Sequence, residues 1–282
     1  MKKIAVLLTV FNRKMITLAG LQRLYTALNY LDDSLYDVFM VDDGSTDGTV
    51  DAITLKFPDI HIIKGNGNLF WSGGMRLAWE TALKTSNYNY IVWFNDDAMI
   101  YPYALKALFE ADLYYNGNAI ITGAFKDENG VASYGGRNKS EQIVTPNGKY
   151  QEIYLMNGNL VLIPQNIVNR IGIIDPIFKH SLGDWDYGCR AIKAGFKVIL
   201  TKEYIGQTNR HDMCIADPFL NKYTLKQRIK KLYSPKHHPK LSWIFNIRHM
   251  GIKKALRTLF IEHLYVFFPT AAIIVRKIQH KT

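Results

Sequence analysis

The stretch DVFMVDDGSTDGTV, residues 37–50, decides the fold. A strand is expected at 37–41, because Asp37 is followed by the apolar run 38–41, and two aspartates come directly after it. A Gly-containing turn then leads into a segment with helical spacing of Val50, Ile53 and Leu55, so a helix is expected from about Thr46. The stretch therefore predicts a strand, a tight turn and a helix in immediate succession.

The neighbouring segments repeat this pattern. An apolar run at Ile4–Val10 predicts a first strand, the segment 15–31 predicts an amphipathic helix, and the run 61–64 predicts a third strand. The order strand, helix, strand, helix, strand is typical of an α/β protein with a mostly parallel sheet that helices flank on both faces.

Acidic residues follow two of these strands. After a Gly- and Asn-rich loop at 65–68, a helix is expected at 72–84 and a fourth strand at 90–94, which ends in Asp96 and Asp97. In open α/β sheets, ligands bind beyond the carboxyl ends of the strands. The pairs Asp42/Asp43 and Asp96/Asp97 are therefore expected on one functional edge.

Each acidic pair has two interpretations. Adjacent carboxylates at Asp96 and Asp97 repel one another unless a positive group lies beside them, and a divalent cation is one such group. The alternative is a turn, or a cap for a helix expected at 103–111. Asp42 and Asp43 are placed to accept hydrogen bonds from a nucleotide base or ribose, whereas the ordinary interpretation is a turn in which Ser45 or Thr46 caps the following helix.

The second half of the chain is less regular. A Gly-, Asn- and Ser-rich stretch at 123–149 predicts a loop or a small hairpin insertion, an apolar segment follows at 155–163, and a helix is expected at 185–194. The composition changes after Tyr204, and we place a domain boundary near residue 215. Beyond it, residues 225–277 are basic and amphipathic.

The charge and the apolar start of the chain bear on its binding partner and its location. A net charge of +11 suits an anionic partner such as a nucleic acid, a membrane surface or a phosphorylated substrate. The basic, apolar start of the chain is interpreted as a buried strand and not as a signal peptide, because it is short and lacks a small-residue cleavage site. A cytoplasmic location, at most at the inner face of the membrane, is therefore expected.

Six segments, taken in order along the chain, carry a resemblance to a known family. These are VLLTVFNR (6–13) and VDDGSTDGT (41–49), then GNGNLFWSGGMRLAWETA (65–82) and WFNDDAMIYP (93–102), and finally MNGNLVLIP with FKHSLGDWDYGCRAIKAGFKV (156–164 and 178–198). In this order they resemble the family 2 inverting glycosyltransferases of GT-A fold, with a loop at 68–75 similar to that of rhamnosyltransferase-like members. The resemblance covers residues 1–215 as a catalytic domain and leaves 216–282 as a helical, basic region.

The resemblance implies roles for individual residues. Asp97 would hold a divalent metal, Mg²⁺ or Mn²⁺, with His211 near the metal and diphosphate. Arg76 and Arg210 would neutralise the diphosphate, although relatives often carry Asn near position 76. The residues expected to contact the nucleotide sugar are Thr9, Phe11, Arg13, Asp42, Asp43, Asn68, Arg76 and Asp96.

The catalytic base is expected at Asp184. Inversion requires a carboxylate that removes the proton of the attacking acceptor hydroxyl. The family places this base second in a Glu-Asp pair, but here the pair is Gly183-Asp184, so acceptor contacts of the missing Glu are in question. The alternative is that Asp184 caps the helix at 185–194. Trp185, beside it, is expected in the acceptor site, whereas Trp79 and Trp93 are expected in the core.

The resemblance thus implies transfer of a sugar from a UDP- or dTDP-type donor to a glycan or lipid-diphosphate-linked acceptor in surface polysaccharide assembly. A nucleotidyltransferase is the second interpretation, but the first loop lacks a Gly-rich phosphate motif. A nucleic-acid-binding protein is the third, but the basic residues lie in the tail, away from the strand-end acids. The tail, with an apolar stretch at 259–275 that is short and interrupted for a span, is expected to lie on a membrane surface, to pack on the catalytic domain or to form a homodimer.

Overall fold

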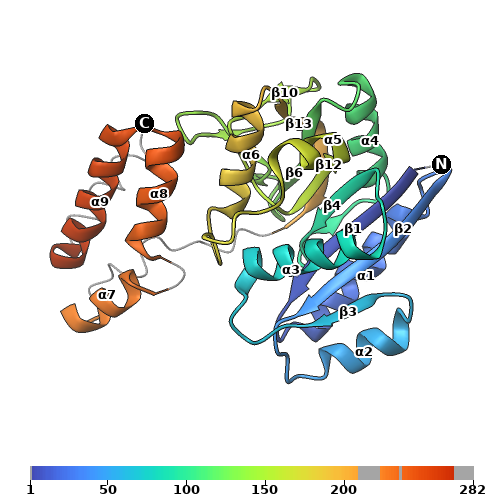
Figure 1. Cartoon of the computed structure of the whole chain (residues 1–282), viewed down its shortest axis with the longest axis horizontal. Helices are drawn as coiled ribbons and strands as arrows, with labels where there is room; N and C mark the ends of the chain where they lie inside the picture. The colour runs from blue at the N-terminus through green and yellow to red at the C-terminus, as the bar shows by residue number, and fades with distance from the viewer. Residues whose placement is uncertain (1, 209–222, 235–236, 270–282) are drawn as a thin grey trace. The chain divides into compact units, whose positions relative to one another are not determined.

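The computed structural model describes residues 2–208, 223–234 and 237–269. The chain divides into two compact units, one formed by Met1–Lys179 with Gly183–Arg210, and the other by His180–Leu182 with His211–Thr282. Figure 1 shows the elements of each unit. The boundary expected near residue 215 lies outside the described residues.

The first half of the larger unit alternates strands and helices as expected. The elements are β1 (Lys2–Val10), α1 (Lys14–Leu28), β2 (Ser34–Asp42), α2 (Thr49–Lys56), β3 (His61–Lys64), α3 (Phe70–Thr85) and β4 (Tyr90–Phe94). β1 pairs in parallel with both β2 and β4, and β2 pairs in parallel with β3. The chain start is therefore a buried central strand, as the sequence predicts.

The second half extends the sheet on the far side of β4. Its elements are β5 (Met99–Ile100), α4 (Ala104–Tyr114), β6 (Ala119–Lys126), β7 (Ala132–Tyr134), β8 (Gly136–Arg137), β9 (Ile143–Val144), β10 (Gln151–Glu152), β11 (Leu155–Met156), β12 (Leu160–Pro164), α5 (Gln165–Ile171), α6 (Gly183–Lys193) and β13 (Lys197–Gln207). The main strand order is β10-β13-β6-β12-β4-β1-β2-β3. Within it β12 is antiparallel to both neighbours, and β13 is parallel to β6. The sheet is thus mixed but mostly parallel.

Two apolar cores lie on opposite faces of the sheet. In β1, Ile4, Val6 and Leu8 point into the core that α1 and α4 cover, while Ala5 and Leu7 point into the core that α3, α5 and α6 cover. Alternate side chains of a strand face opposite sides, so a continuous apolar run is what a sheet covered on both faces requires. Figure 1 shows these helices on either side of the sheet.

Two local expectations are wrong. The insertion expected at 123–149 begins only after Lys126, because residues 123–126 belong to β6. Helix α2 begins at Thr49 with Gly48 as its N-cap and no side-chain cap. Neither Ser45 nor Thr46 caps it, because Gly48, at φ 76°, takes the left-handed conformation of the turn.

The smaller unit contains α7 (Leu225–Leu232), α8 (Pro239–His249) and α9 (Ile252–Phe267). α8 and α9 are joined by a hydrogen bond from Oγ of Ser242 to Oε1 of Glu262 at 2.9 Å. Burial raises the pKa of Glu262 to about 7. No helix in the described part of the chain is long and apolar enough to cross a bilayer.

Candidate active site

The two aspartates that follow β4 share one positively charged partner. Nη1 of Arg13 donates to Oδ1 of Asp96 at 2.8 Å and to Oδ2 of Asp97 at 3.1 Å. Asp96 is almost fully buried, whereas the side chain of Asp97 is 15% exposed. Burial raises the pKa of Asp96 above the usual aspartate value, and Arg13 and Thr17 offset part of the rise. The guanidinium supplies the positive charge that the adjacent carboxylates need.

Helix α1 fixes this carboxylate pair from one side. Oγ1 of Thr17 donates to Oδ2 of Asp96 at 2.7 Å. A Cβ at Gly20, one turn further on, would lie only 2.1 Å from the backbone oxygen of Asp96. Gly20 is therefore required for the close packing of α1 against the Asp96 peptide.

The alternative role as a helix cap is wrong for these aspartates. The N-cap of α4 is Tyr103, and no side chain caps that helix. The alternative role in a turn is correct, because the amide of Ala98 donates to the oxygen of Asn95 at 3.0 Å. A turn and a charged site thus coexist at this strand end.

Asp43 organises the loop before α3. Its Oδ1 accepts from the amide of Gly67 at 2.8 Å, and its Oδ2 accepts from the amides of Leu69 and Phe70 at 2.9 and 3.0 Å. Asp42 accepts from the amide of Ser45 at 3.1 Å. Both carboxylates are buried. Asp43 therefore shapes the loop that carries Asn68, which is itself exposed.

The loops after β1 and β2 are tied to each other. The amide of Asn12 donates to Oγ of Ser45 at 2.9 Å, and the amide of Thr46 donates to Oδ1 of Asn12 at 2.7 Å. Phe11 is 54% exposed at this edge. Thr9 faces α3, where a Cβ at Gly74 would lie 2.2 Å from its Oγ1. Thr9 is therefore a packing residue of this edge as well as a candidate nucleotide contact.

Asp184 has the properties of a general base. It lies in the first turn of α6, where its Oδ1 accepts from the amide of Trp185 at 2.9 Å and its Oδ2 from the amide of Gly158 at 3.1 Å. Burial raises its pKa to about 6, and the two amide bonds offset part of this effect. A carboxylate with a pKa near the working pH is well suited to proton transfer.

Trp71 connects the β4 end to the surroundings of Asp184. Its Nε1 donates to Oδ1 of Asn95 at 2.7 Å. A Cβ at Gly158 would lie 2.5 Å from Cζ2 of Trp71, so the indole packs directly on the peptide that holds Asp184. Beneath it lie Trp93 and Trp79, both fully buried as expected. Trp71 therefore contacts both Asn95, next to Asp96, and Gly158, whose amide binds Asp184, and it packs edge to face on Trp93.

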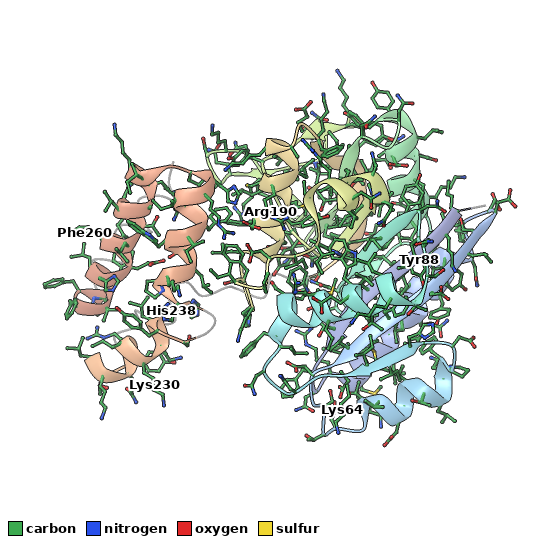
Figure 2. All side chains as sticks on the ribbon, in the orientation of Figure 1. Lys64, Tyr88, Arg190, Lys230, His238 and Phe260 are labelled. Atoms are coloured by element: carbon green, nitrogen blue, oxygen red, sulfur yellow. The ribbon has the colours of Figure 1, made fainter. Side chains whose placement is uncertain are left out.

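Asp186, two residues after Asp184, has a structural role. Its Oδ2 accepts from Nε of Arg190 at 2.7 Å, and Arg190 also donates to the backbone oxygens of Ile171 and Ile173 at 2.6 and 2.9 Å. Figure 2 labels Arg190 on α6. Asp184, in contrast, accepts its hydrogen bonds from the backbone amides of Gly158 and Trp185.

The remaining residues predicted to bind the diphosphate or the metal are Arg76, Arg210 and His211. Arg76 pairs with Glu80 at 2.8 Å and donates to the backbone oxygen of Ile174, so the structure does not bring its guanidinium to Asp96 or Asp97. Arg210 and His211 lie outside the described residues. The site as described therefore consists of the 9–13 loop, the Asp42–Asn68 region, Asp96, Asp97 and Asp184.

The residues at the β4 end fit a hard divalent cation. Carboxylate oxygens are the ligands that Mg²⁺ and Mn²⁺ prefer, and Mg²⁺ is usually bound by one or two carboxylates together with phosphate oxygens and water. Among the described residues, no group of three or more His, Cys, Asp and Glu side chains is placed to hold a metal. Most of the ligands would therefore come from a bound diphosphate and water.

The sequence indicates Trp71 only as an aromatic residue for stacking on a sugar or base or for packing in the core, and it does not predict Thr17, Asn95 or Gly158 as site residues. Two features of the sequence point weakly to these contacts. One is Gly20 in α1, where a glycine allows another backbone to approach, and the other is the run of small residues that follows Trp71. Neither signal is specific, because their partners are backbone groups of segments distant in sequence.

A mostly parallel sheet of this strand order, with carboxylates beyond β4, defines the GT-A class of glycosyltransferases. The chain belongs to glycosyl transferase family 2, whose model matches residues 5–178. This membership favours the glycosyltransferase interpretation over the two alternatives.

Solved structures agree with the fold. The structure of the mannosyltransferase PcManGT from Pyrobaculum calidifontis, in complex with GDP-Man and Mn²⁺, has a TM-score of 0.57 at 16% identity, covering 99% of this chain and 80% of that one. GalNAc-T7 with UDP, GalNAc and Mn²⁺ has a TM-score of 0.54 at 13% identity, covering 82% of this chain and 48% of that one, so the match spans about half of GalNAc-T7. No curated protein sequence matches the chain.

Proposed function

We propose that the chain is a metal-dependent inverting glycosyltransferase. It transfers a sugar from a UDP- or dTDP-type donor to a glycan or lipid-diphosphate-linked acceptor in surface polysaccharide assembly. The observation that carries this proposal is the pairing of a charged carboxylate site, Asp96 and Asp97, with a separate carboxylate of raised pKa, Asp184.

The proposed reaction divides the roles between these two positions. Asp97 would hold Mg²⁺ or Mn²⁺, which would supply Lewis-acid stabilisation for the leaving nucleoside diphosphate, and Asp96 would lie near the ribose. Asp184 accepts the proton of the acceptor hydroxyl while that oxygen attacks the anomeric carbon. The loops at 9–13 and 42–47 and Asn68 contact the nucleotide. His211, which lies outside the described residues, is the proposed second metal ligand, whereas Arg76 is held by Glu80 and by the backbone oxygen of Ile174 and is assigned no role in the reaction.

Release of a nucleoside diphosphate tests this function. The wild type is incubated with UDP- and dTDP-sugars, Mn²⁺ and an extract of lipid-linked glycans, and free diphosphate is measured. We expect acceptor-dependent release that Asp97→Asn abolishes and Asp51→Asn, an exposed aspartate of α2, leaves unchanged. Equal release by wild type and Asp97→Asn would refute the metal role.

We further propose that the smaller unit binds an anionic membrane surface. Residues spaced four apart on α9, Ile252, Leu256 and Phe260, are 54%, 53% and 66% exposed. The exposed Lys253 and Arg257 lie beside them. Figure 2 shows Phe260 on the side of α9 that faces away from α8. An exposed apolar stripe flanked by basic residues is typical of helices that lie in an anionic interface.

Vesicle co-sedimentation tests the membrane contact. We expect binding to vesicles with anionic lipid and none to neutral vesicles, with loss of binding in Phe260→Ser. Leu113→Ser, which replaces an apolar residue of α4 that is 77% exposed, is the matched control. A dimer that Phe260→Ser converts to a monomer, without vesicle binding by either form, would show that the stripe is a subunit interface instead.

A further inference from the structure

The guanidinium of Arg13 binds the two carboxylates and takes no part in capping α1. Arg13 is the N-cap residue of α1, but its side chain makes no cap hydrogen bond. Its backbone is fixed, since its oxygen accepts from the amide and from Oγ1 of Thr17 at 2.9 and 3.0 Å. Its side chain is 38% exposed. The guanidinium is therefore able to leave the carboxylates without any change in the backbone.

The two carboxylates are unequal partners of Arg13. Asp96 is nearly fully buried and keeps the hydroxyl of Thr17 on its second oxygen. Asp97 is the more exposed of the two and its bond to Nη1 is the longer one, at 3.1 Å compared with 2.8 Å. Separation of Arg13 from Asp97 therefore costs less than separation from Asp96.

We propose that Arg13 is a built-in counter-cation that occupies the metal-binding carboxylates of the donor-free enzyme, and that a divalent metal binds only when Arg13 releases Asp97. This inference rests on the proposed function, because it assumes that Asp97 is the metal ligand. Arg13 lies on one carboxylate oxygen of each aspartate, and its positive charge repels a divalent cation at short range, so the guanidinium and the metal compete for this site.

The competition between Arg13 and the metal makes metal binding depend on the bound nucleotide. A metal that arrives alone must displace Arg13 into solvent. When a nucleoside diphosphate is present, the displaced guanidinium has phosphate oxygens as new partners, and Arg pairs well with phosphate. The metal and the diphosphate therefore bind with positive cooperativity, and Arg13 carries a share of that coupling. The device keeps the metal weakly bound until a donor arrives.

Calorimetric titration with Mn²⁺ tests the competition on the full chain. The wild type is compared with Arg13→Gln and with Arg23→Gln, a control at an exposed arginine on the same helix. A neighbouring opposite charge changes the cation affinity of a carboxylate by about tenfold or more, so we expect Mn²⁺ alone to bind about tenfold more tightly to Arg13→Gln. The titration is repeated in the presence of UDP and of dTDP. The factor by which the diphosphate tightens Mn²⁺ binding should decrease in Arg13→Gln and stay unchanged in Arg23→Gln.

The outcomes separate this inference from the proposed function. Equal or weaker Mn²⁺ binding by Arg13→Gln, relative to the wild type, would overturn the counter-cation role while leaving the metal site intact. Absence of Mn²⁺ binding by every variant, with and without diphosphate, would overturn the metal-dependent function itself, and the counter-cation role with it.

A measurement on the wild type covers the case in which Arg13→Gln does not fold. In protein labelled with ¹⁵N-arginine, the Nε resonance of Arg13 is assigned by its loss in Arg13→Lys, which keeps the positive charge. Addition of Mg²⁺ should shift this resonance and leave that of Arg23 in place. A titration that reaches Mg²⁺ saturation without moving the Arg13 resonance would contradict the proposal.

Discussion

Nε1 of Trp71 donates a hydrogen bond to Oδ1 of Asn95 at 2.7 Å, and this bond fixes α3 to the residue that precedes Asp96. The same indole packs on Gly158, whose amide holds Asp184. One side chain therefore sets the spacing between the proposed metal site and the proposed base.

Trp71→Phe tests this spacing, because it keeps an aromatic ring and removes the donor. Small misplacements of catalytic groups are costly, so we expect transfer to slow by roughly 10- to 100-fold while nucleotide binding is retained. The control is Trp79→Phe, since Nε1 of Trp79 has no hydrogen-bond partner in the described structure. Unchanged transfer rates in Trp71→Phe would contradict the positioning role.

Asp184→Asn tests the base through rate. We expect wild-type transfer to decline as the pH falls through about 6, the raised pKa of Asp184, and Asp184→Asn to lose roughly 10²- to 10⁴-fold in rate. A pH profile that is flat between 5 and 8 would argue against Asp184 as the base.

The same substitution also changes how stability depends on pH. Because the pKa of Asp184 is raised, the native state holds this proton more tightly than the unfolded chain, and stability declines as the pH rises from about 4 through about 6. Calorimetry should therefore show the melting temperature of Asp184→Asn rising relative to that of the wild type between pH 4 and pH 8. The loss of one accepting oxygen, which leaves the amide of Gly158 or Trp185 without its partner, lowers the stability of the variant by a similar amount at every pH. Asp186→Asn should melt below the wild type, because it disrupts the contact with Arg190.

Adjacent glycines in α3 provide a matched pair for packing. A Cβ at Gly74 would meet Oγ1 of Thr9 at 2.2 Å, whereas a Cβ at Gly73 would meet the nearest atom, Cβ of Leu69, at 3.4 Å. Overpacking should make Gly74→Ala less stable by about 1–3 kcal/mol. Gly73→Ala should be neutral or up to about 1 kcal/mol more stable, because alanine favours the helix. Urea unfolding distinguishes them, and equal midpoints would contradict the close approach.

Asp43→Asn tests the loop before α3. An amide group has only one accepting oxygen, so at least one of the three backbone amides that Asp43 binds is left unsatisfied. We expect a loss of about 2–3 kcal/mol. Asp42→Asn, beside it, affects one amide and should cost less than about 1 kcal/mol. Chemical unfolding measures both, and similar losses would indicate that Asp43 does not organise the loop.

The sequence predicts those parts of the fold that depend on local pattern. The strands at His61–Lys64 and Tyr90–Phe94 have the predicted bounds, because each is a short run with apolar residues that is set off by turn-forming residues. The polar, Gly-rich composition of residues 123–149 predicts an insertion that begins at Gly123, although this glycine belongs to β6. That glycine is needed for packing, since a Cβ there would lie 2.5 Å from Cδ1 of Ile205.

The candidate site was predictable in composition but not in its internal contacts. Asp96 and Asp97 stand out because two carboxylates follow a buried strand. Their pairing with Arg13 depends on residues more than 80 positions apart, and Asp43 binds backbone amides, which every residue except proline carries. No side-chain pattern in the sequence identifies such partners.

The central claim is that Asp97 supports a metal-dependent nucleotide site, and thermal stabilisation tests it most directly. The melting temperature is measured with UDP, dTDP, GDP and CDP, each with and without Mn²⁺, for the wild type, Asp97→Asn and Asp51→Asn. A ligand that binds only the native state raises its stability by mass action. We predict a Mn²⁺-dependent rise for UDP or dTDP that Asp51→Asn keeps and Asp97→Asn loses. A rise that is independent of Mn²⁺, or that persists in Asp97→Asn, would contradict the claim.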